Sequence, residues 1–468
     1  MFFTNWHYRM AISQGFTVSV YVIAALGAFE QISELLGLTL LTFMPLGGIS
    51  IPLEAIIAEG IPKTLWPLAA ASPLPALRGE ATATKSRSKV RVLHYMGTNF
   101  GMTGVETFIL QLCAAQKRAG LIPSIVMDLS NRQDVRTIAN DLGICVHDLP
   151  SERPFEHRFL RKLGTAILRA RRIHVLRRML RQNDVLHIQA VGISCLDGFI
   201  AAALARTRVV VTHHGTLSWF EPQWDLLADI TFWIEKRTAS SIAMPYAAAA
   251  AELCREGISP ERAKVIPFCV DEQLFSGVAP APSTGELTLV LVARMVEGKG
   301  HVDLLAALAK LTPSYPGLRA VFIGDGPIRT RIEAEIDRLG LRQTVDCTGK
   351  VDHREVPALL RRAHVVVLPS YEAGEMFPLC LLEGMALGLP AIGSRWSGIP
   401  DIIENNVTGI IVEPRDECDL ARAIERFLRD PDFLARARRG ALERVRSRFT
   451  ATAVAESYAV CYRTALSI

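Results

Sequence analysis

The 468-residue sequence has no closely spaced pair of cysteines. Its nine cysteines are an odd number and lie far apart, and the C-x-x-C motif does not occur. Disulfide frameworks and zinc sites both need paired or clustered thiols. These absences argue against either kind of cross-link. They predict reduced thiols, most of them small core residues, in a cytosolic environment.

The two common glycine-rich nucleotide motifs are also missing. There is no G-x-x-x-x-G-K-[ST] loop, which weighs against an ATPase, and no G-x-G-x-x-G fingerprint, which weighs against hydride transfer. The one D-x-D motif, Asp430 and Asp432, lies in a late connection between predicted helices. There it is typical of a turn and a helix cap, so no metal site is predicted.

Charge is sparse and unevenly distributed. Only 21% of the residues are charged and half are hydrophobic, so the chain can bury large cores. Residues 89–266 carry 23 Lys and Arg against 16 Asp and Glu, whereas residues 287–468 carry 24 against 23. The first of these regions is therefore expected to face something anionic.

The first 88 residues differ in kind from the rest. Residues 11–29 and 35–53 are uncharged runs of 19, close to the ~20 residues of a membrane span. Polar residues interrupt the first run, and proline and glycine interrupt the second. A membrane hairpin, a hydrophobic collar and translated sequence upstream of the true start all remain open. We assign residues 1–71 as a hydrophobic extension and residues 72–88 as a flexible linker.

From residue 89 onward, predicted strands alternate with predicted helices. The alternation pauses at residues 267–286, which are rich in Pro, Gly, Ser and Ala, and then resumes. This order predicts the α/β class, with two tandem Rossmann-like, doubly wound domains at residues 89–266 and 287–448. Ligands bind at the carboxyl ends of the strands in such sheets, which predicts a site between the domains.

Two glutamates, Glu375 and Glu383, bracket seven uncharged residues. Pro378 suits a first helical turn, so Glu375 is expected just before a helix and Glu383 within it. Eight helical residues advance about 12 Å, whereas a glycosidase pair lies only about 5–10 Å apart. We interpret the two acids as groups that hold hydroxyls at two ends of one ligand.

Cations are available to balance a phosphate between those ends. Arg294 ends a predicted strand and Lys299 follows in the next loop. Arginine offers a planar fork and lysine a point charge, and a helix N-terminus near Phe377 adds backbone N–H groups. A sugar, a diphosphate and a ribose would each find a partner, so the predicted ligand is a nucleotide sugar.

These residues carry a resemblance to the retaining glycosyltransferases of family 4, which have the GT-B architecture. It extends from about residue 89 to 465. Glu375 and Glu383 match the E-x7-E motif, and Arg294 and Lys299 match the R-x4-K pair. The tail, residues 449–468, resembles the terminal helix that packs back on the first domain.

Smaller motifs resemble the same family. Gly324 lies in a G-D-G-P turn, and Gly104 lies in the turn before the first helix. Val351 ends the T-G-K-V stretch, residues 348–351, which matches the family segment whose backbone contacts the nucleotide base. His214 matches the histidine near the donor sugar, with His213 as its rival. The resemblance implies two sets of site residues. The catalytic set is His214, Arg294, Lys299 and Glu375. The donor-binding set is Gly104, Gly324, Val351, Met376, Phe377, Leu379 and Glu383.

The chain departs from the family pattern at three places. Met376-Phe377-Pro378 replaces Gly-Phe-Gly, so one backbone N–H is lost. Thr103-Gly104 replaces Gly-Gly, and His187-Ile188-Gln189 replaces H-x-H. A structural interpretation also stays open, in which Arg294 and Lys299 merely pair with Glu297 or Asp325.

The resemblance implies a metal-independent hexosyl transfer that retains the anomeric configuration, with Arg294 and Lys299 neutralising the leaving diphosphate. Two other classes remain. One is a GT-B relative that isomerises or phosphorolyses sugars, for which no pyridoxal-binding lysine is identified. The other is a catalytically silent, membrane-associated protein that binds nucleotide sugars.

A basic segment, residues 157–183, contains nine Lys and Arg and no acid. Its apolar residues give it one predicted apolar side: Leu160, Leu163, Ile167, Leu168, Ile173, Leu176 and Leu180. Such helices lie on anionic membranes, with about 1 kcal/mol per basic residue, although a solvated face or an acceptor patch is the alternative. Membrane contact predicts a cytoplasmic protein at the inner face of the cell membrane. It also predicts a glycan or lipid-linked acceptor, as in bacterial polysaccharide biosynthesis. Nucleic acid is not an expected partner, since aromatic interleaving is lacking.

Overall fold

The computed structural model describes residues 89–97, 104–130, 132–151, 158–190, 192–215, 226–281, 283, 286–372 and 374–467. The predicted N-terminal extension and linker lie outside these residues. Within them, no helix combines the length and the apolar composition that a membrane crossing needs.

The first domain is built on a seven-stranded parallel sheet with the order β3-β2-β1-β4-β5-β6-β7. The order reverses between β1 and β4, which is where doubly wound sheets bind ligands beyond the carboxyl ends of the strands. The strands are β1 (Arg91–Tyr95), β2 (Ile122–Met127), β3 (Cys145–Asp148), β4 (Val185–Ile188), β5 (Arg208–Thr212), β6 (Ala239–Met244) and β7 (Ala263–Val265).

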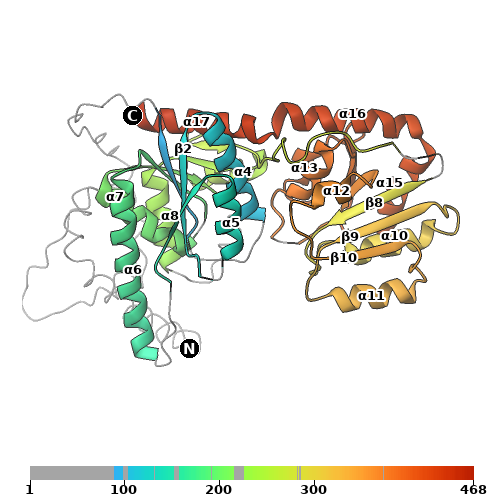
Figure 1. Ribbon diagram of the computed structural model, residues 1–468, viewed down its shortest axis with the longest axis horizontal. Helices are drawn as coiled ribbons and strands as arrows, with labels where there is room; N and C mark the ends of the chain where they lie inside the picture. Colours follow the sequence, from blue (N-terminus) through green and yellow to red (C-terminus); the bar gives the residue numbers. More distant parts are fainter. Residues whose placement is uncertain are drawn as a thin grey trace, which may run out of the picture.

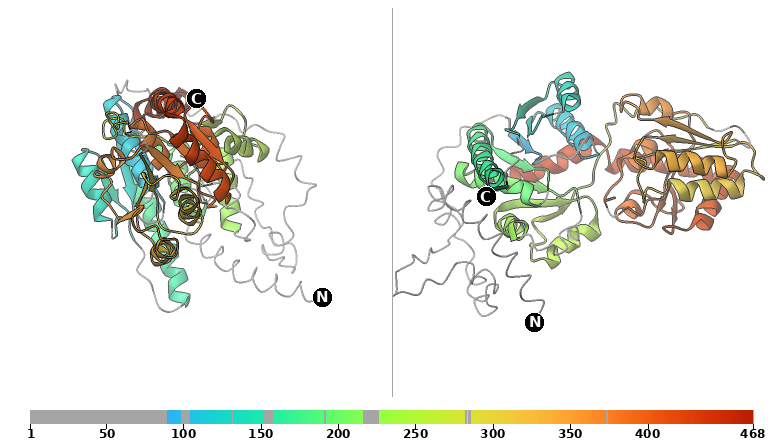
Figure 2. Two further views of the ribbon diagram at one scale, coloured as in Figure 1. Left: turned by 90° about the vertical axis from the view of Figure 1, so that its right-hand side faces the viewer. Right: turned by 90° about the horizontal axis from the view of Figure 1, so that it is seen from below.

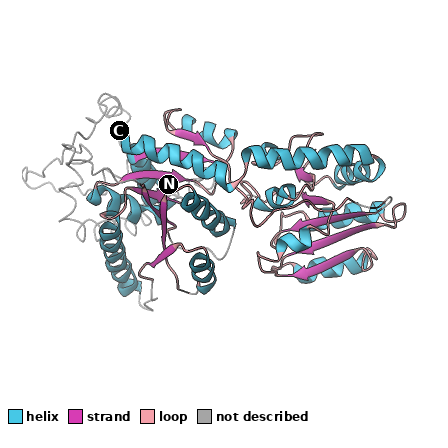
Figure 3. Cartoon of the chain, turned by 45° about the horizontal axis from the view of Figure 1, so that its top comes forward, coloured by secondary structure: helices cyan, strands magenta, loops and turns pink. Residues whose placement is uncertain are grey.

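Helices cover both faces of this sheet, as Figure 3 shows for each half of the molecule. They are α4 (Gly104–Arg118), α5 (Gln133–Asp141), α6 (Arg158–Leu180), the 3-10 helix η2 (Gly192–Cys195), α7 (Leu196–Ala205), α8 (Leu226–Thr238) and α9 (Ala247–Arg255). Because the sheet is covered on both sides, its central strands are buried, and all four residues of β4 are buried, His187 among them.

The second domain repeats the plan with a six-stranded parallel sheet in the order β10-β9-β8-β11-β12-β13. Its strands are β8 (Leu287–Val292), β9 (Leu318–Ile323), β10 (Val345–Gly349), β11 (Val365–Leu368), β12 (Ala391–Ser394) and β13 (Gly409–Val412). Its helices are α10 (His301–Leu311), α11 (Arg329–Arg338), α12 (Val356–Leu360), α13 (Leu379–Ala386), α14 (Ile399–Ile402) and α15 (Glu417–Arg429). The predicted pair of doubly wound α/β domains is confirmed.

Two terminal helices connect the domains, α16 (Pro431–Arg448) and α17 (Ala451–Ser467). Figure 1 shows α16 along the second domain and α17 along the first, and Figure 2 shows the same crossing from below. The turn between them is fixed by Val270, which bridges to Thr450. From there α17 packs against α4, β5 and β6. The last helix of the chain is thus part of the core of the first domain.

The basic helix α6 uses its apolar residues differently from the sequence prediction. Leu168, Leu176 and Leu180 are buried, and α6 packs against α7. Arg172 is also buried, where it donates to the carbonyl of Pro150 at 2.7 Å. Over the second half of α6, the predicted apolar side therefore faces the protein, and an external surface would meet the opposite face.

The exposed face of α6 is mostly basic. One apolar residue, Ile167, is 53% exposed. Among the residues of α6 whose side chains are described, the other exposed ones follow at helical spacing: Ala170, Arg171, His174 and Arg178, with Arg181 just beyond its end.

Candidate functional site

The loop between β8 and α10 places Lys299 against the segment that follows β11. Gly298 and Gly300 flank the lysine, and both have left-handed φ values, +84° and +81°. A Cβ on Gly300 would lie 2.4 Å from Pro369, so only glycine allows this close approach. The glycines, which fix the lysine backbone, are a feature that the sequence analysis did not single out.

The side chain of Lys299 is held by two carboxylates. Its Nζ lies 2.8 Å from Glu375 and 2.6 Å from Glu372. Burial opposes the charged form, but the Glu375 and Glu372 carboxylates outweigh it and raise the pKa of Lys299. The structure thus brings together two predicted site residues and adds Glu372, whose role has no local sequence signal.

Arg294 lies just beyond β8 and is exposed. The acids that were its alternative partners are engaged elsewhere, since Asp325 pairs with Arg329 and Glu297 with Arg331. In the described part of the chain, Arg294 makes no ion pair. Its guanidinium therefore stays available for an external anion.

The turn at Gly324–Gly326 packs against the backbone on either side of Arg294. Gly324 has φ +140°, and a Cβ there would lie 2.0 Å from the carbonyl oxygen of Ala293. A Cβ on Gly326 would lie 2.3 Å from the carbonyl oxygen of Met295. The two glycines therefore let the ends of β8 and β9 approach each other.

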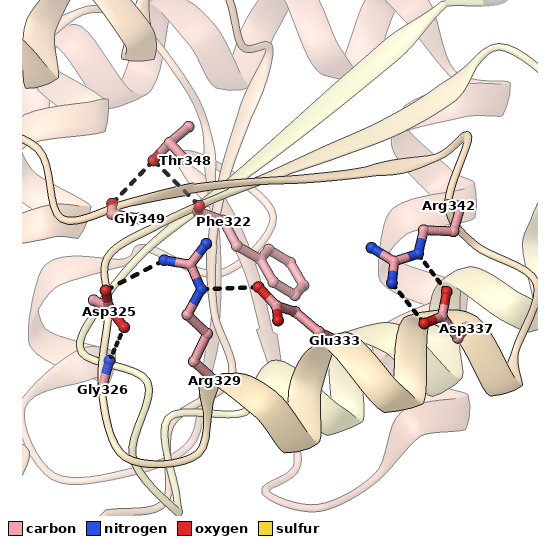
Figure 4. A network of polar contacts seen from close by, with 9 residues as sticks. All are labelled: Phe322, Asp325, Gly326, Arg329, Glu333, Asp337, Arg342, Thr348 and Gly349. Carbon is pink, nitrogen blue, oxygen red and sulfur yellow. Dashed lines mark hydrogen bonds and ion pairs between the residues drawn. The ribbon is translucent and has the colours of Figure 1, made fainter.

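Figure 4 shows the polar contacts around this turn and at the end of β10. Arg329 bonds Asp325 at 3.2 Å and Glu333 at 2.8 Å. The Thr348 hydroxyl donates to the carbonyl of Phe322 at 3.4 Å. Val351, half-buried, follows at the end of the same stretch.

Helix α13 begins at Leu379, with Pro378 as its N-cap residue and no side-chain cap. Glu375 precedes the helix and Glu383 lies within it, and both are buried. A Cβ on Gly384 would meet Val366 at 2.7 Å, so this glycine lets α13 lie close to β11. The uncapped N–H groups at the start of α13 are left for another acceptor.

Glu383 has a partner that the sequence analysis missed. His353 Nε2 lies 2.8 Å from a carboxylate oxygen of Glu383. Burial lowers the pKa of His353, but the hydrogen bond and the charge of Glu383 outweigh it, so the net shift is upward. The histidine thereby orients the carboxylate within the domain.

His214 lies just after β5 in the first domain and is half-buried. Its Nε2 is 2.9 Å from Gln189 Oε1, and its ring stacks on Phe268 with centroids 4.9 Å apart. Burial and, to a lesser extent, His213 lower the pKa of His214 to about 3. His213 itself is fully buried with Nε2 2.5 Å from Glu235, so it is not accessible to a ligand.

Two contacts bring the domains together at these residues. Phe268 lies between His214 and Phe377, with its ring centroid 5.9 Å from that of Phe377. An ideal Cβ on Gly104 would lie 3.8 Å from Leu379 Cδ1, so the N-terminal residues of α4 and α13 face each other. Both helix ends carry partial positive charge, which makes the space near them favourable for an anion.

The loop after β12 supports Met376 and Phe377. Ser397 donates to the Tyr246 hydroxyl of the first domain at 3.1 Å, and Gly398 N donates to the Met376 carbonyl at 3.0 Å. Trp396 Nε1 donates to the carbonyl of Glu372 at 2.8 Å. Ser397 has φ +49°, a strained value for a residue with a Cβ.

Two family models match the chain in tandem. "Glycosyltransferase Family 4" matches residues 102–274, and "Glycosyl transferases group 1" matches residues 278–444. Together they span the two domains described above. Within the described residues, no cluster of His, Cys, Asp or Glu has the arrangement of a metal site.

Curated relatives and solved structures give similar matches. A subunit of the phosphatidylinositol N-acetylglucosaminyltransferase of Arabidopsis thaliana is 27% identical over 349 residues, which cover 73% of this chain and 74% of the relative. A glycogen synthase of Mycobacterium tuberculosis is 35% identical over 201 residues, 42% of this chain and 47% of the relative. The crystal structure of Anabaena Alr3699/HepE in complex with UDP superposes with a TM-score of 0.67 at 19% identity, covering 80% of this chain and 100% of that one.

Proposed function

The chain belongs to glycosyltransferase family 4, of the group 1 type, and from this premise we propose that it is a retaining transferase. It moves a hexosyl group from a nucleotide sugar to a hydroxyl of a glycan or lipid-linked acceptor in cell-surface polysaccharide biosynthesis. The observation that carries the proposal is the ion pair of Lys299 with Glu375 beside the N-terminus of α13, which faces the N-terminus of α4.

The donor is held by complementary charge. Its diphosphate lies near Arg294, Lys299 and the two helix ends, where cations and backbone N–H groups neutralise it. Glu383, oriented by His353, accepts hydrogen bonds from the ribose hydroxyls. Glu375, bonded to Lys299, does the same for the sugar. The backbone around the donor is shaped by five residues of the second domain and one of the first. These are Gly324, Val351, Met376, Phe377 and Leu379, together with Gly104.

The reaction exchanges one C–O bond for another on the same face of the sugar. The bond between the anomeric carbon and the diphosphate oxygen breaks while the acceptor oxygen bonds to the anomeric carbon. The acceptor proton passes to the leaving diphosphate. Negative charge grows on that diphosphate, and Arg294 and Lys299 stabilise it more strongly in the transition state than in the ground state. These cations supply the neutralisation, so no metal is part of the proposal.

We place the acceptor at an anionic membrane surface on the cytoplasmic side. Two observations support this. The exposed face of α6 carries Arg171 and Arg178, and Figure 1 shows α6 on the side of the first domain that is turned away from the second. The Arabidopsis relative is named for a phosphatidylinositol acceptor. Arg171, Arg178 and Arg181 would each gain about 1 kcal/mol near such a surface.

A donor panel tests the transferase. The full chain is screened by thermal shift against UDP, GDP and ADP sugars, and each sugar that binds is assayed for release of nucleoside diphosphate with and without an acceptor. UDP-glucose is the first choice, because Alr3699/HepE has been crystallised with it. We expect stabilisation by one base and release of its diphosphate. Binding without release would favour the catalytically silent alternative, and absence of any binding would contradict both.

Flotation with vesicles tests the membrane surface. The wild type is expected to float with phosphatidylglycerol-containing vesicles and not with pure phosphatidylcholine. A variant with Arg171, Arg178 and Arg181 changed to Ser should lose most of this binding at physiological salt. The control changes three exposed arginines of α15 and α16, namely Arg422, Arg436 and Arg439. Equal flotation of both triple variants would contradict the assignment to α6.

A further inference from the structure

A chain of buried polar side chains runs from His214 to the terminal helix α17. Every member except His214 is at most 2% exposed. The chain crosses the ends of β1, β4 and β5 and the body of α4. Its members, in bonding order, are His214, Gln189, His94, Gln116, Tyr462, His187, Thr212 and Tyr458.

In the first half of this hydrogen-bonded network, the donor of each hydrogen bond can be assigned. His214 Nε2 faces the amide oxygen of Gln189 at 2.9 Å, so that nitrogen carries the proton. The amide nitrogen of Gln189 then donates to His94 Nδ1 at 3.1 Å, and it also lies 3.2 Å from His187 Nδ1, an acceptor for its second N–H. With Nδ1 accepting, His94 donates from Nε2 to the amide oxygen of Gln116 at 2.8 Å.

The second half continues in the same direction. Gln116 donates to the Tyr462 hydroxyl at 2.9 Å, and that hydroxyl donates to His187 Nδ1 at 2.7 Å. His187 donates from Nε2 to the Thr212 hydroxyl at 2.7 Å. Thr212 is 2.7 Å from the Tyr458 hydroxyl, which closes the chain on α17. One assignment of tautomers satisfies every step.

This assignment requires all three histidines to be neutral, and the burial of the network agrees. Burial lowers the pKa of His94 to about 4 and that of His214 to about 3. It holds the pKa of His187 well below its usual value. No acid belongs to this hydrogen-bonded network, so none of its members favours an imidazolium.

The other ring nitrogen of His214 has a distinct position. Nδ1 is buried and has no hydrogen-bond partner among the described residues. Since the Gln189 oxygen keeps the proton on Nε2, Nδ1 presents an unused lone pair. The Phe268 ring fixes the plane of the imidazole and separates it from Phe377 of the donor-binding segment by a single ring.

We propose that Gln189 is a positioning residue that locks His214 as the Nε2–H tautomer, so that Nδ1 accepts a hydrogen bond from a hydroxyl of the donor sugar. The proposal rests on the transferase function proposed above. If Gln189 were merely structural, the orientation of its amide would not determine which nitrogen of His214 carries the proton. Reversing the Gln189 amide would place an N–H opposite His214 Nε2 and would move the proton to Nδ1, where it would donate rather than accept.

The network also explains why the lock holds. The Gln189 amide orientation is set by His94, whose own tautomer is set by Gln116 and the Tyr462 hydroxyl on α17. The terminal helix thereby fixes a tautomer at the site. Tyr462→Phe removes a hydroxyl inside the chain, whereas Tyr458→Phe removes one at its far end. This makes a matched pair of buried tyrosines on one helix.

Nitrogen-15 NMR of the full chain tests the tautomer without any substrate. Histidine is labelled selectively, and the His214 signals are assigned by their loss in His214→Asn. We expect a protonated Nε2 and an unprotonated Nδ1 in the wild type and in Tyr458→Phe. Gln189→Leu and Tyr462→Phe should shift the signals toward a mixture of tautomers. A protonated Nδ1 in the wild type, or unchanged signals in a folded Gln189→Leu, would overturn the proposal.

Kinetics separate positioning from folding. Gln189→Leu should lower kcat about tenfold, the equivalent of one hydrogen bond, and change the donor KM less. The double variant Gln189→Leu/His214→Ala should be no slower than His214→Ala alone, because Gln189 acts through His214. If the losses in kcat of the two single variants multiplied in the double variant, the proposal would be overturned. If no donor is turned over at all, the transferase proposal fails while the NMR result still decides the tautomer.

Discussion

Lys299 Nζ lies 2.8 Å from a carboxylate oxygen of Glu375, although 76 residues separate the two in sequence. The pair joins the loop after β8 to the segment after β11, neighbouring strands in the second sheet. The Glu375 and Glu372 carboxylates outweigh the burial of the half-buried Lys299 and raise its pKa, which favours the ammonium form before any donor arrives. The site is thus charged in advance for a ligand that carries both phosphate and hydroxyl groups.

Replacement of Lys299 by Met should affect both turnover and stability. It leaves Glu375 and Glu372 facing each other without a cation, which should cost about 3 kcal/mol of unfolding free energy. It also removes a charge that stabilises the leaving diphosphate, so kcat should fall at least about 100-fold. Chemical denaturation and a diphosphate-release assay measure the two effects.

The control for this variant is Lys310→Met. Lys310 also pairs with a glutamate, Glu417, at 3.3 Å, but the side chains of both are exposed. Its loss should change stability little, because solvent screens an exposed ion pair, and should leave turnover unchanged. Comparable effects of both substitutions would contradict the special role of Lys299.

The buried histidines predict a loss of stability in mild acid. Burial lowers the pKa of His94 from 6.5 to about 4, so between these values the unfolded chain binds a proton that the native state excludes. Stability is full above pH 6.5 and falls as the pH approaches 4. The fall from His94 alone should be about 2 kcal/mol between pH 7 and pH 5.

Denaturant titrations at these two pH values check this effect. The unfolding free energy of His94→Gln should fall less between pH 7 and pH 5 than that of the wild type. The control is His174→Gln, at an exposed position on α6, which should fall as much as the wild type. His187 and His214 act in the same direction, so part of the fall should remain. A wild-type stability that is flat over this range would contradict neutral burial of the network.

The His353–Glu383 pair predicts coupled effects on nucleotide binding. Glu383→Ala should weaken the affinity for the nucleoside diphosphate about tenfold or more, because a charge-assisted bond to the ribose is lost. His353→Ala should weaken it less, by releasing the carboxylate from its orientation. Titration calorimetry measures both. The double variant should match Glu383→Ala, and a further loss in it would show that His353 meets the ligand independently.

The pair also has a pH dependence of opposite sign to that of His94. The pKa of His353 is raised, so its contribution to folding is complete below the unfolded value of 6.5. That contribution is lost as the pH rises through the raised folded value. In Glu383→Ala the pKa of His353 should fall, which proton NMR of the ring measures directly.

The sequence predicted what is encoded locally. Alternating strand and helix patterns predicted both sheets, because each strand is a short apolar run bounded by turn residues. The position of Glu375 before α13 and of Glu383 within it followed from Pro378. Charge spacing also indicated the basic face of α6.

Pairings between distant segments left no such local trace. Glu372 and His353 hold Lys299 and Glu383 only because strand order brings their loops together. The network from His214 to Tyr462 depends on a helix from the end of the chain that packs on the first sheet. On α6, the sequence could not show that Leu176 and Leu180 are buried in the protein core rather than against a membrane, because both surroundings favour the same residues.

Ser397 provides a last test, at the contact between the domains. Its φ of +49° is strained for any residue with a Cβ, and its hydroxyl donates to Tyr246 across the domain boundary. Ser397→Ala keeps the strain and loses the bond, whereas Ser397→Gly loses the bond but relieves about 1 kcal/mol of strain. We therefore expect Ser397→Gly to unfold at a higher temperature than Ser397→Ala. Adding Tyr246→Phe to either variant should change its unfolding temperature little, because the hydrogen bond between residues 397 and 246 is already absent. If Ser397→Gly were the less stable of the two, the backbone at this position would not be strained in solution, and the hydroxyl alone would account for the serine.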